Sequence, residues 1–148
     1  MSGKDWLLDR VNQRNRRTLR EETIQQQMGA VFVSVCETVQ AAAERYSRLD
    51  QGEPVQCSAA DGTMMVVSIY QRGKQPEPRL ERERVTIRLR RDPPAIIASY
   101  RTEIAEREFP FDLDAEGRAV VLFGGKRLTP DQAAERILTP ALFPDLEE

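Results

Sequence analysis

Apolar residues recur at alternating spacings of four and three through the first third of the chain. They are Met28, Phe32, Val35, Val39, Ala42, Tyr46 and Leu49. An average spacing of 3.5 residues draws one apolar stripe along an α-helix. The chain after Asp50 has the pattern of strands and turns, so this stripe must be buried against a small sheet or a second copy of itself. We therefore predict an α+β fold: a long N-terminal helix, an antiparallel meander of about five strands and a short C-terminal helix.

The segment before the stripe favours helix but is almost wholly polar. Between residues 12 and 27 only Leu19 and Ile24 are apolar, and no proline interrupts the run. A helix that is polar on all sides is either surrounded by solvent or frayed. We therefore predict an ordered helix from about residue 20, and one domain over residues 1–148 in which residues 1–20 form a separate or frayed basic helix.

The middle of the chain alternates apolar and polar residues, which is typical of strands. The predicted strands are Val55–Ala60, Thr63–Gln71, Arg82–Arg90, Ala95–Arg107 and Arg118–Phe123, with 109–113 extending or bending the fourth. Asp61-Gly62 favours a two-residue hairpin turn of type I′. Two prolines in 73–78 predict a loop, and Asp92-Pro93-Pro94 forces a break between strands.

The strongest local signal lies near the C-terminus. Thr129, Pro130, Asp131 and Gln132 supply an N-cap, a proline at the first helical position, an acid in the first turn and the partner of a capping box. The sequence predicts a helix from Pro130 to about Leu138. We expect Pro140 to stop it.

Two of the predicted strands are apolar on both faces, over residues 64–69 and 119–123. A sheet with one wet face alternates instead. Fully burying such a side chain contributes about 1.5–3 kcal/mol, too much to leave several in water. We expect the second face to be covered in part by a helix or by another subunit, and this is the main argument for a homodimer.

Composition narrows the class of protein. The 148 residues are 40% hydrophobic and 31% charged, with a formal net charge of -2, so nothing directs the chain toward nucleic acid or a membrane. The first ten residues lack the apolar core of a secretory leader. Cys36 and Cys57 are too few for a disulfide scaffold and are expected to be free thiols in a reducing compartment, which indicates the cytoplasm.

The chain contains no histidine. Histidine is the usual general base near neutral pH and the commonest metal ligand, so Ser-His and Cys-His catalysis are excluded in their ordinary forms. Asp112, Asp114 and Glu116 lack the spacing of a calcium loop and are interpreted as a polar turn. Trp6 is interpreted as a packing residue. We expect no catalytic site, no metal and no cofactor.

The clearest candidate contact is a strand rich in arginine. Arg82, Arg84, Arg88 and Arg90 share one face of the predicted strand, and Arg101 lies on the next one. Guanidinium groups in such a row could bind an anion or a partner. Alternatively, they are solvated and paired with neighbouring glutamates. This face offers no aromatic residue for stacking nucleic-acid bases.

Two further candidates are weaker. Arg10, Arg14 and Arg17 line one side of the N-terminal segment; Glu21 follows Arg17 by four residues and favours an ordinary solvated ion pair. Gly124-Gly125-Lys126 before a helix is suggestive of an anion site but does not match a phosphate loop, and a tight connection explains it.

The sequence thus predicts a non-catalytic cytoplasmic binding protein that forms a homodimer or binds another protein. The apolar stripe, chiefly Met28, Phe32, Val35, Val39 and Tyr46, would be its core or its oligomer seam. The alternative is a helix-and-sheet cup for a small ligand. Nucleic-acid binding through the arginines is the least favoured, and no membrane contact is expected.

Overall fold

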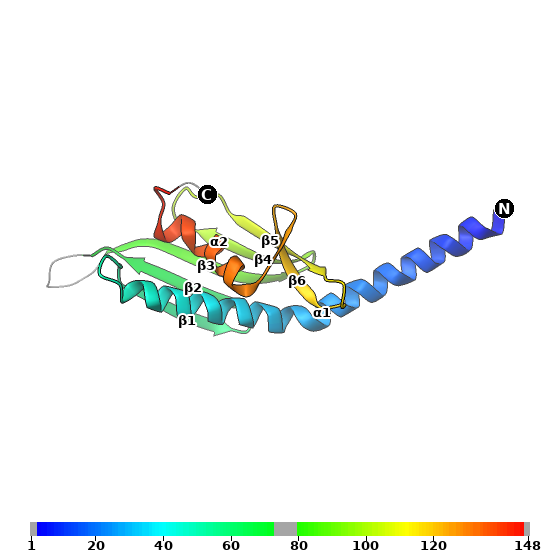
Figure 1. Ribbon diagram of the computed structural model, residues 1–148, viewed down its shortest axis with the longest axis horizontal. Coiled ribbons are helices and arrows are strands. Elements are labelled where there is room, and N and C mark those ends of the chain that lie inside the picture. Colours follow the sequence, from blue (N-terminus) through cyan, green and yellow to red (C-terminus); the bar gives the residue numbers. More distant parts are fainter. Residues whose placement is uncertain (1–2, 73–79, 147–148) are drawn as a thin grey trace.

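The computed structural model describes residues 3–72 and 80–146, and the predicted loop at 73–78 lies outside them. Within this part of the chain the fold has two helices and seven strands. They are α1 (Gly3–Ser47), β1 (Val55–Asp61), β2 (Met64–Tyr70), β3 (Glu81–Arg91), β4 (Pro94–Tyr100), β5 (Arg107–Leu113), β6 (Ala119–Phe123), β7 (Lys126–Leu128) and α2 (Pro130–Leu142). All neighbouring strands are antiparallel and follow chain order, so the sheet is a simple meander (Figure 1).

This architecture confirms the predicted α+β class, but the prediction of about five strands is too low. One reason is that the predicted strand Ala95–Arg107 is two strands, with a bend after Tyr100. The carboxylate of Glu83 holds that bend, because it accepts hydrogen bonds from the backbone amides of Arg101 (2.9 Å) and Thr102 (3.2 Å). Glu83 is 1% exposed, so a buried carboxylate binds the amides of two residues whose other side faces solvent.

The second reason for the higher strand count is a hairpin turn that adds β7. Gly124 and Gly125 have φ angles of 60° and 78°, which suit a type I′ turn, and they join β6 to the short extra strand β7.

The turn predicted at Asp61-Gly62 lies one residue later, because Asp61 pairs with Met64. The Asp61 carboxylate closes it by accepting from the backbone amide of Thr63 (2.7 Å).

The prediction of a separate or frayed helix over residues 1–20 is wrong, because α1 is one helix of 45 residues. At 1.5 Å per residue it is about 68 Å long. Helix formation is cooperative, so a half that is packed on the sheet supplies the costly nucleus and the helix-favouring half continues it. Local contacts add to this, including an ion pair between Arg17 and Glu21 at 3.2 Å.

The predicted stripe is the inner face of α1 over most of its length. Four of its residues are buried by the sheet of the same chain, namely Met28 (0% exposed), Phe32 (2%), Val35 (0%) and Val39 (0%). Beyond them the buried position moves to Ala43, while Ala42 is exposed, Tyr46 is half-buried and Leu49 is 58% exposed. A straight helix drifts about 20° per heptad from a 3.5-residue repeat, which accounts for the shift.

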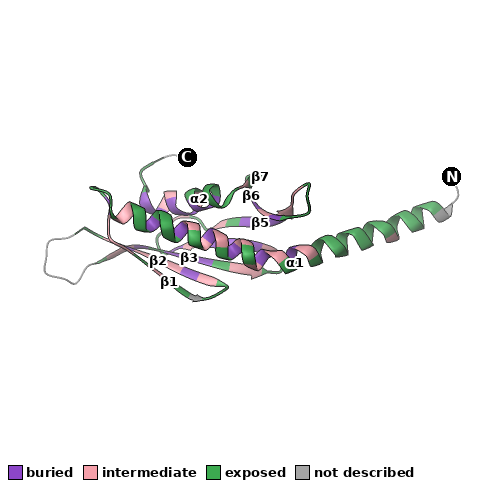
Figure 2. Ribbon diagram, turned by 60° about the horizontal axis from the view of Figure 1, so that its bottom comes forward, coloured by how far each residue is buried: buried purple, intermediate pink, exposed green. Residues whose placement is uncertain are grey.

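Helix α2 lies beside α1, and both cover the same face of the sheet (Figure 2). Its predicted capping box is confirmed: the Thr129 hydroxyl accepts from the Gln132 amide, and the Gln132 side chain accepts from the Thr129 amide. The predicted stop at Pro140 is wrong, since α2 continues to Leu142.

Tertiary contacts allow α2 to continue past Pro140. A proline removes the amide that would bond the carbonyl four residues earlier, here the carbonyl of Arg136. The Arg107 guanidinium on β5 donates to that carbonyl at 2.9 Å. The Tyr100 hydroxyl donates to the next carbonyl, that of Ile137, at 2.6 Å. Both donors come from the sheet, so this region of α2 depends on the fold around it.

Candidate functional site

The most unusual feature of the structure is the first part of α1, residues 3–19, which we call the projecting segment (Figures 1 and 2). The longest strand, β3, has 11 residues, and at about 3.3 Å per residue it spans roughly 36 Å. The helix is about 68 Å long, so the sheet cannot cover all of it. Residues 3–19, about 26 Å of helix, extend beyond the sheet.

Polar side chains fix α1 to the domain where it leaves the sheet. The Gln25 side chain donates to the Arg91 carbonyl at 2.6 Å. The Gln27 side chain donates to the Gly117 carbonyl at 3.1 Å and accepts from the Ala119 amide at 2.7 Å. These bonds hold the helix to the β3–β4 and β5–β6 turns, so the direction of the projecting segment is set by the folded domain.

The outer end of the projecting segment is apolar. Trp6, Leu7 and Leu8 are 61%, 56% and 60% exposed. The interpretation of Trp6 as a packing residue is therefore wrong. Leu19, nearer the sheet, is also 64% exposed. Exposed apolar residues that are contiguous, rather than scattered singly, mark contact sites on folded proteins.

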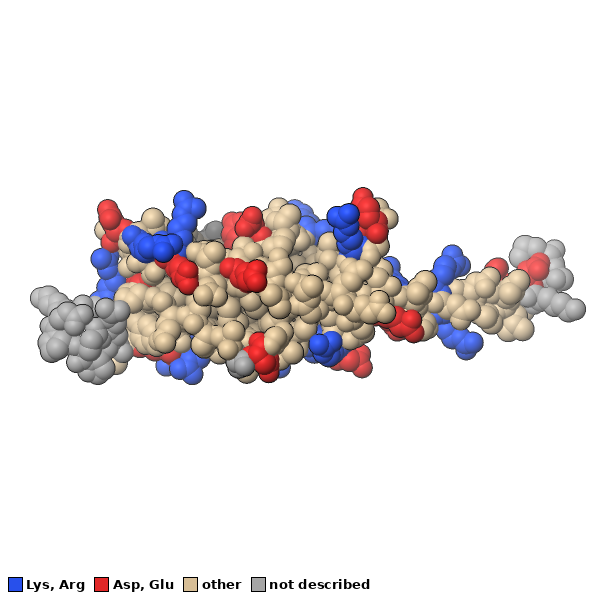
Figure 3. All heavy atoms as spheres, turned by 90° about the horizontal axis from the view of Figure 1, so that it is seen from below, with Lys and Arg blue, Asp and Glu red and all other residues tan. Residues whose placement is uncertain are grey.

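The remainder of the projecting segment is basic. Arg10, Arg14 and Arg17 lie three and four residues apart on one side of the helix, as the sequence predicted. The predicted pair of Arg17 with Glu21 is present, with side chains 80% and 62% exposed. An ion pair this exposed contributes little stability. Figure 3 shows the segment as a narrow rod with cationic side chains along it.

The arginine strand has a different character, because its guanidinium groups on the outer face of the sheet are paired with carboxylates. The pairs are Arg84–Glu81 (2.9 Å), Arg88–Glu106 (3.6 Å), Arg90–Glu108 and Arg101–Glu81 (3.7 Å). The second and third pairs cross over β4, where Ala95 and Ile97 are 0% exposed. Side-chain stems of arginine cover apolar surface well, so these pairs close over the outer face of β4.

Arg82 does not share that face, contrary to the sequence prediction. Ile69 pairs with Glu83 while Tyr70 pairs with Glu81, so Arg82 is the extra residue of a β-bulge. Its guanidinium makes a bidentate contact with Glu53 (2.6 and 2.7 Å). It also donates to the carbonyl of Ala141 at the end of α2 (2.8 Å).

Glu53 also accepts a hydrogen bond from the Tyr46 hydroxyl at 3.2 Å. The bond to Glu53 raises the pKa of Arg82 further above its usual range, and burial raises the pKa of Tyr46. This cluster joins the ends of both helices to β3. These contacts give Arg82 a structural role, and no binding role is needed to explain its position.

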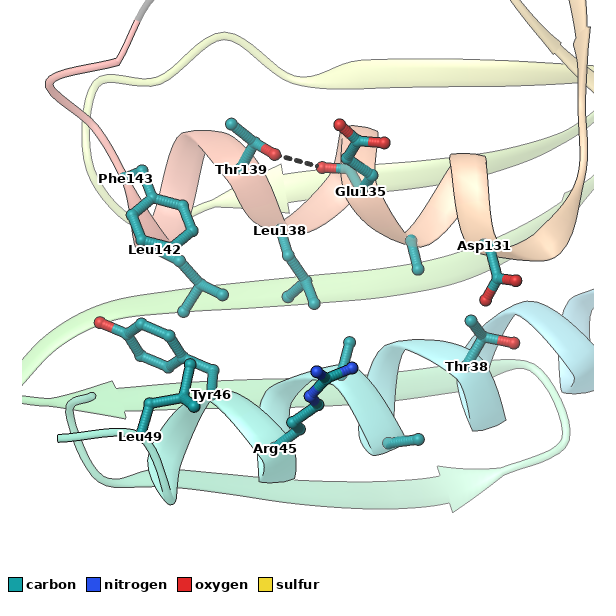
Figure 4. A pocket seen from close by; sticks show the side chains of 13 residues that line it. Thr38, Arg45, Tyr46, Leu49, Asp131, Glu135, Leu138, Thr139, Leu142 and Phe143 are labelled. Carbon is teal, nitrogen blue, oxygen red and sulfur yellow. Dashed lines mark hydrogen bonds between the residues drawn. The ribbon is translucent and has the colours of Figure 1, made fainter. Parts of the chain in front are cut away.

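An open groove of about 520 Å³ runs between the C-terminal part of α1 and the length of α2. Figure 4 shows Leu138 and Leu142 of α2 directed toward α1 across it. Tyr46 and Phe143 meet edge to face at one end, with ring centroids 5.7 Å apart. Exposed alanines of α1 form its other wall. Arg45 and Asp131 place charged groups at the rim of the groove, while the Glu135 carboxylate points away from α1.

The acidic run at the β5–β6 connection is a turn, as predicted. The Asp114 carboxylate accepts from the amides of Glu116 and Arg118, both at 2.9 Å. The bond from Arg118 is the main reason that the pKa of Asp114 lies below its usual range. Asp112 pairs instead with Arg20 of α1. Among the described residues no three His, Cys, Asp or Glu side chains gather to hold a metal ion.

Comparison with known proteins identifies no relative: no family model, no curated protein and no solved structure matches the chain. Over residues 3–72 and 80–146, no helix is both long and apolar enough to cross a lipid bilayer. The candidate site must therefore be argued from its own geometry.

The sequence contained part of the signal for the projecting segment. Leu7 and Leu8 form an apolar patch, and the polar run after them was visible. The sequence did not reveal how long the sheet is relative to the helix, and this difference decides at which residue of α1 burial ends. The groove between α1 and α2 gave no sequence signal, since it arises from the side-by-side placement of two helices far apart in the chain.

Proposed function

We propose that this protein is a non-catalytic binding module of the cytoplasm that acts as a homodimer and presents its projecting segment to another protein. The observation that carries the proposal is the exposed cluster of Trp6, Leu7 and Leu8 at the end of a helix fixed to a folded domain. Tryptophan is enriched among the residues that dominate protein interfaces. An ordered helix also loses less conformational entropy on binding than a disordered tail would.

The experiment places a photo-reactive amino acid at Leu8 and irradiates cells that express the protein. We expect one discrete adduct, of defined mass, from this position. The matched control carries the same group at Gln13, an exposed polar residue of the same helix. Replacing Trp6 and Leu7 by serine should remove the adduct while the melting temperature of the domain stays unchanged, because neither side chain packs on the sheet.

Two results would contradict the proposal. One is equal labelling from Leu8 and Gln13, which would indicate random collision. The other is an adduct that persists after Trp6 and Leu7 are replaced. An adduct with the mass of two chains would instead place the self-association of this protein on the projecting segment.

A second candidate function is the binding of a small ligand, and the groove between α1 and α2 is the observation that favours it. Its volume of about 520 Å³ falls within the range of ligand sites. A mainly apolar ligand with polar groups at its ends would suit walls of leucine and alanine and a rim that carries Arg45 and Asp131. A rise in melting temperature with such a compound, absent in a variant of the exposed groove residue Ala42, Ala42→Arg, would support this function.

The ion pairs of the outer sheet face argue against nucleic-acid binding through the arginine strand. Binding to phosphates needs cations that are free to replace counterions. Arg84, Arg88 and Arg90 are already neutralised by glutamates. Titration of a generic DNA or RNA probe at low salt tests this expectation, and a strong salt-dependent shift would contradict it.

A further inference from the structure

Strand β1 forms one edge of the sheet (Figure 1). It pairs with β2 on one side only. An edge strand presents a row of main-chain donors and acceptors to solvent, and proteins usually guard it with charged residues or proline. The stretch Val55–Ala59 carries no charge and no proline. This edge is therefore open to another strand.

The hydrogen-bond pattern shows which groups are open. The Tyr70 amide donates to the Pro54 carbonyl at 2.9 Å. Main-chain groups of an antiparallel strand alternate between its two sides, so the amides and carbonyls of Gln56 and Ser58 face β2. The groups directed away from β2 belong to Val55, Cys57 and Ala59. In the described part of the chain no hydrogen bond reaches them.

We propose that β1 pairs antiparallel with β1 of a second copy of this chain, about a two-fold axis at Cys57. In this register Cys57 lies opposite its own copy, and Val55 lies opposite Ala59 of the partner. All three pairs then exchange both of their main-chain bonds, which gives six hydrogen bonds. The inference rests on the homodimer of the proposed function and gives that homodimer an interface.

The ends of β1 select this register. Pro54 precedes the open stretch, and a bulge between Ala59 and Asp61 follows it. Both features interrupt strand pairing. A symmetric pairing centred on Val55 or Ala59 would run into one of them, whereas the register centred on Cys57 uses the whole open stretch.

The side chains are compatible with self-pairing. A residue on a two-fold axis meets itself, so a charged one would repel its copy. Burial raises the pKa of Cys57 to about 11, and the thiol is therefore neutral at physiological pH. On the outer face Gln56 lies opposite Ser58 of the partner, a pair that can hydrogen-bond. Within the paired stretch Val55–Ala59 no residue is charged.

The dimer would be one continuous sheet with the helices of both copies on the same face. A two-fold axis perpendicular to a sheet reverses every direction within the plane. The two projecting segments would therefore point away from each other, and the assembly would present two contact sites at opposite ends.

Two measurements test the inference. Sedimentation should give twice the 16.9 kDa chain mass for the wild type. Cys57→Pro removes an amide that faces away from β2, so the fold should be kept while the mass falls to that of one chain. Cys57→Ala keeps the amide and should remain dimeric. Circular dichroism and melting temperature check that the proline variant is folded.

Residue-resolved amide exchange gives a second readout. The amides of Val55, Cys57 and Ala59 should be protected only at concentrations where the dimer forms. Those of Gln56 and Ser58, which bond to β2, should be protected at every concentration. A dimer that folded Cys57→Pro leaves intact overturns the β1 interface but not the homodimer, whereas a monomeric wild type overturns both. Contact through the projecting segment is tested separately and can succeed or fail alone.

Discussion

Glu83 offers the most demanding test of how this fold is held. Its carboxylate is 1% exposed and accepts bonds from three backbone amides: that of Arg84 at 2.8 Å, Arg101 at 2.9 Å and Thr102 at 3.2 Å. The Thr102 hydroxyl donates to it as well. We predict that Glu83→Ala destabilises the domain strongly, because the bend between β4 and β5 loses its acceptors.

The magnitude follows from the bonds. Each hydrogen bond to a charged group contributes about 1.5–3 kcal/mol, and a buried donor left unpaired costs about 1–3 kcal/mol. Water can reach the exposed side of Arg101 and Thr102, so we expect about 3 kcal/mol for Glu83→Ala rather than the full sum. Glu83→Gln keeps one oxygen and should cost about 1–2 kcal/mol. Domains of this kind unfold with about 5–15 kcal/mol, so both losses are measurable.

Urea unfolding followed by circular dichroism measures these free energies, provided that the slope with denaturant is unchanged. Glu103→Ala is the matched control, since this exposed glutamate lies in the same bend and should change the free energy by less than about 0.5 kcal/mol. The reasoning is refuted if Glu83→Ala costs no more than Glu83→Gln, or no more than the control.

Three further predictions concern other parts of the chain. Removing residues 3–17 should change the free energy of unfolding by less than about 1 kcal/mol, because this part of α1 buries nothing on the sheet; a larger loss in urea unfolding would contradict that. Arg107→Ala should cost about 2 kcal/mol in the wild type and about 1 kcal/mol less in Pro140→Ala, whose new amide can bond the freed carbonyl; equal costs in a double-mutant cycle would exclude this coupling. Burial raises the pKa of Cys36 from 9.0 to about 12, so its proton is lost first from the unfolded chain and stability should fall as pH rises above about 9. Cys36→Ala should lose less stability between pH 8 and pH 10, and parallel losses would show that the thiol is not responsible.

Those parts of the fold that depend on neighbours in the sequence could be predicted from it. The stripe from Met28 to Val39 and the capping box at Thr129 are both local patterns, and both are confirmed. What failed depends on distant partners. Glu83 ends β4 from a neighbouring strand, and Arg107 lets α2 continue through Pro140 from another. Neither contact leaves a pattern in the sequence.

The arginine strand shows the same limit at a candidate site. Alternation placed Arg82 with Arg84, Arg88 and Arg90, but a one-residue bulge turns Arg82 toward the helices. A bulge changes which face of the sheet the neighbouring side chains occupy, and the residue type at position 82 does not predict a bulge. The prediction that arginines of this strand pair with nearby glutamates is confirmed. It needed only that basic and acidic residues lie on neighbouring segments, which the sequence shows.

The surfaces left for contact follow from a mismatch of lengths. A helix of about 68 Å on strands of at most about 36 Å must either bend, end or project. Fixed by Gln25 and Gln27 at the edge of the sheet, α1 projects. Packing of α1 on the sheet buries Ile24 and the apolar stripe after it, whereas Trp6, Leu7, Leu8 and Leu19 of the projecting segment stay exposed. The same meander ends at β1, whose stretch Val55–Ala59 carries no charge. The domain thus keeps its core closed and leaves the projecting segment of α1 and the outer side of β1 exposed. The experiments above can remove the contacts proposed for these two surfaces one at a time.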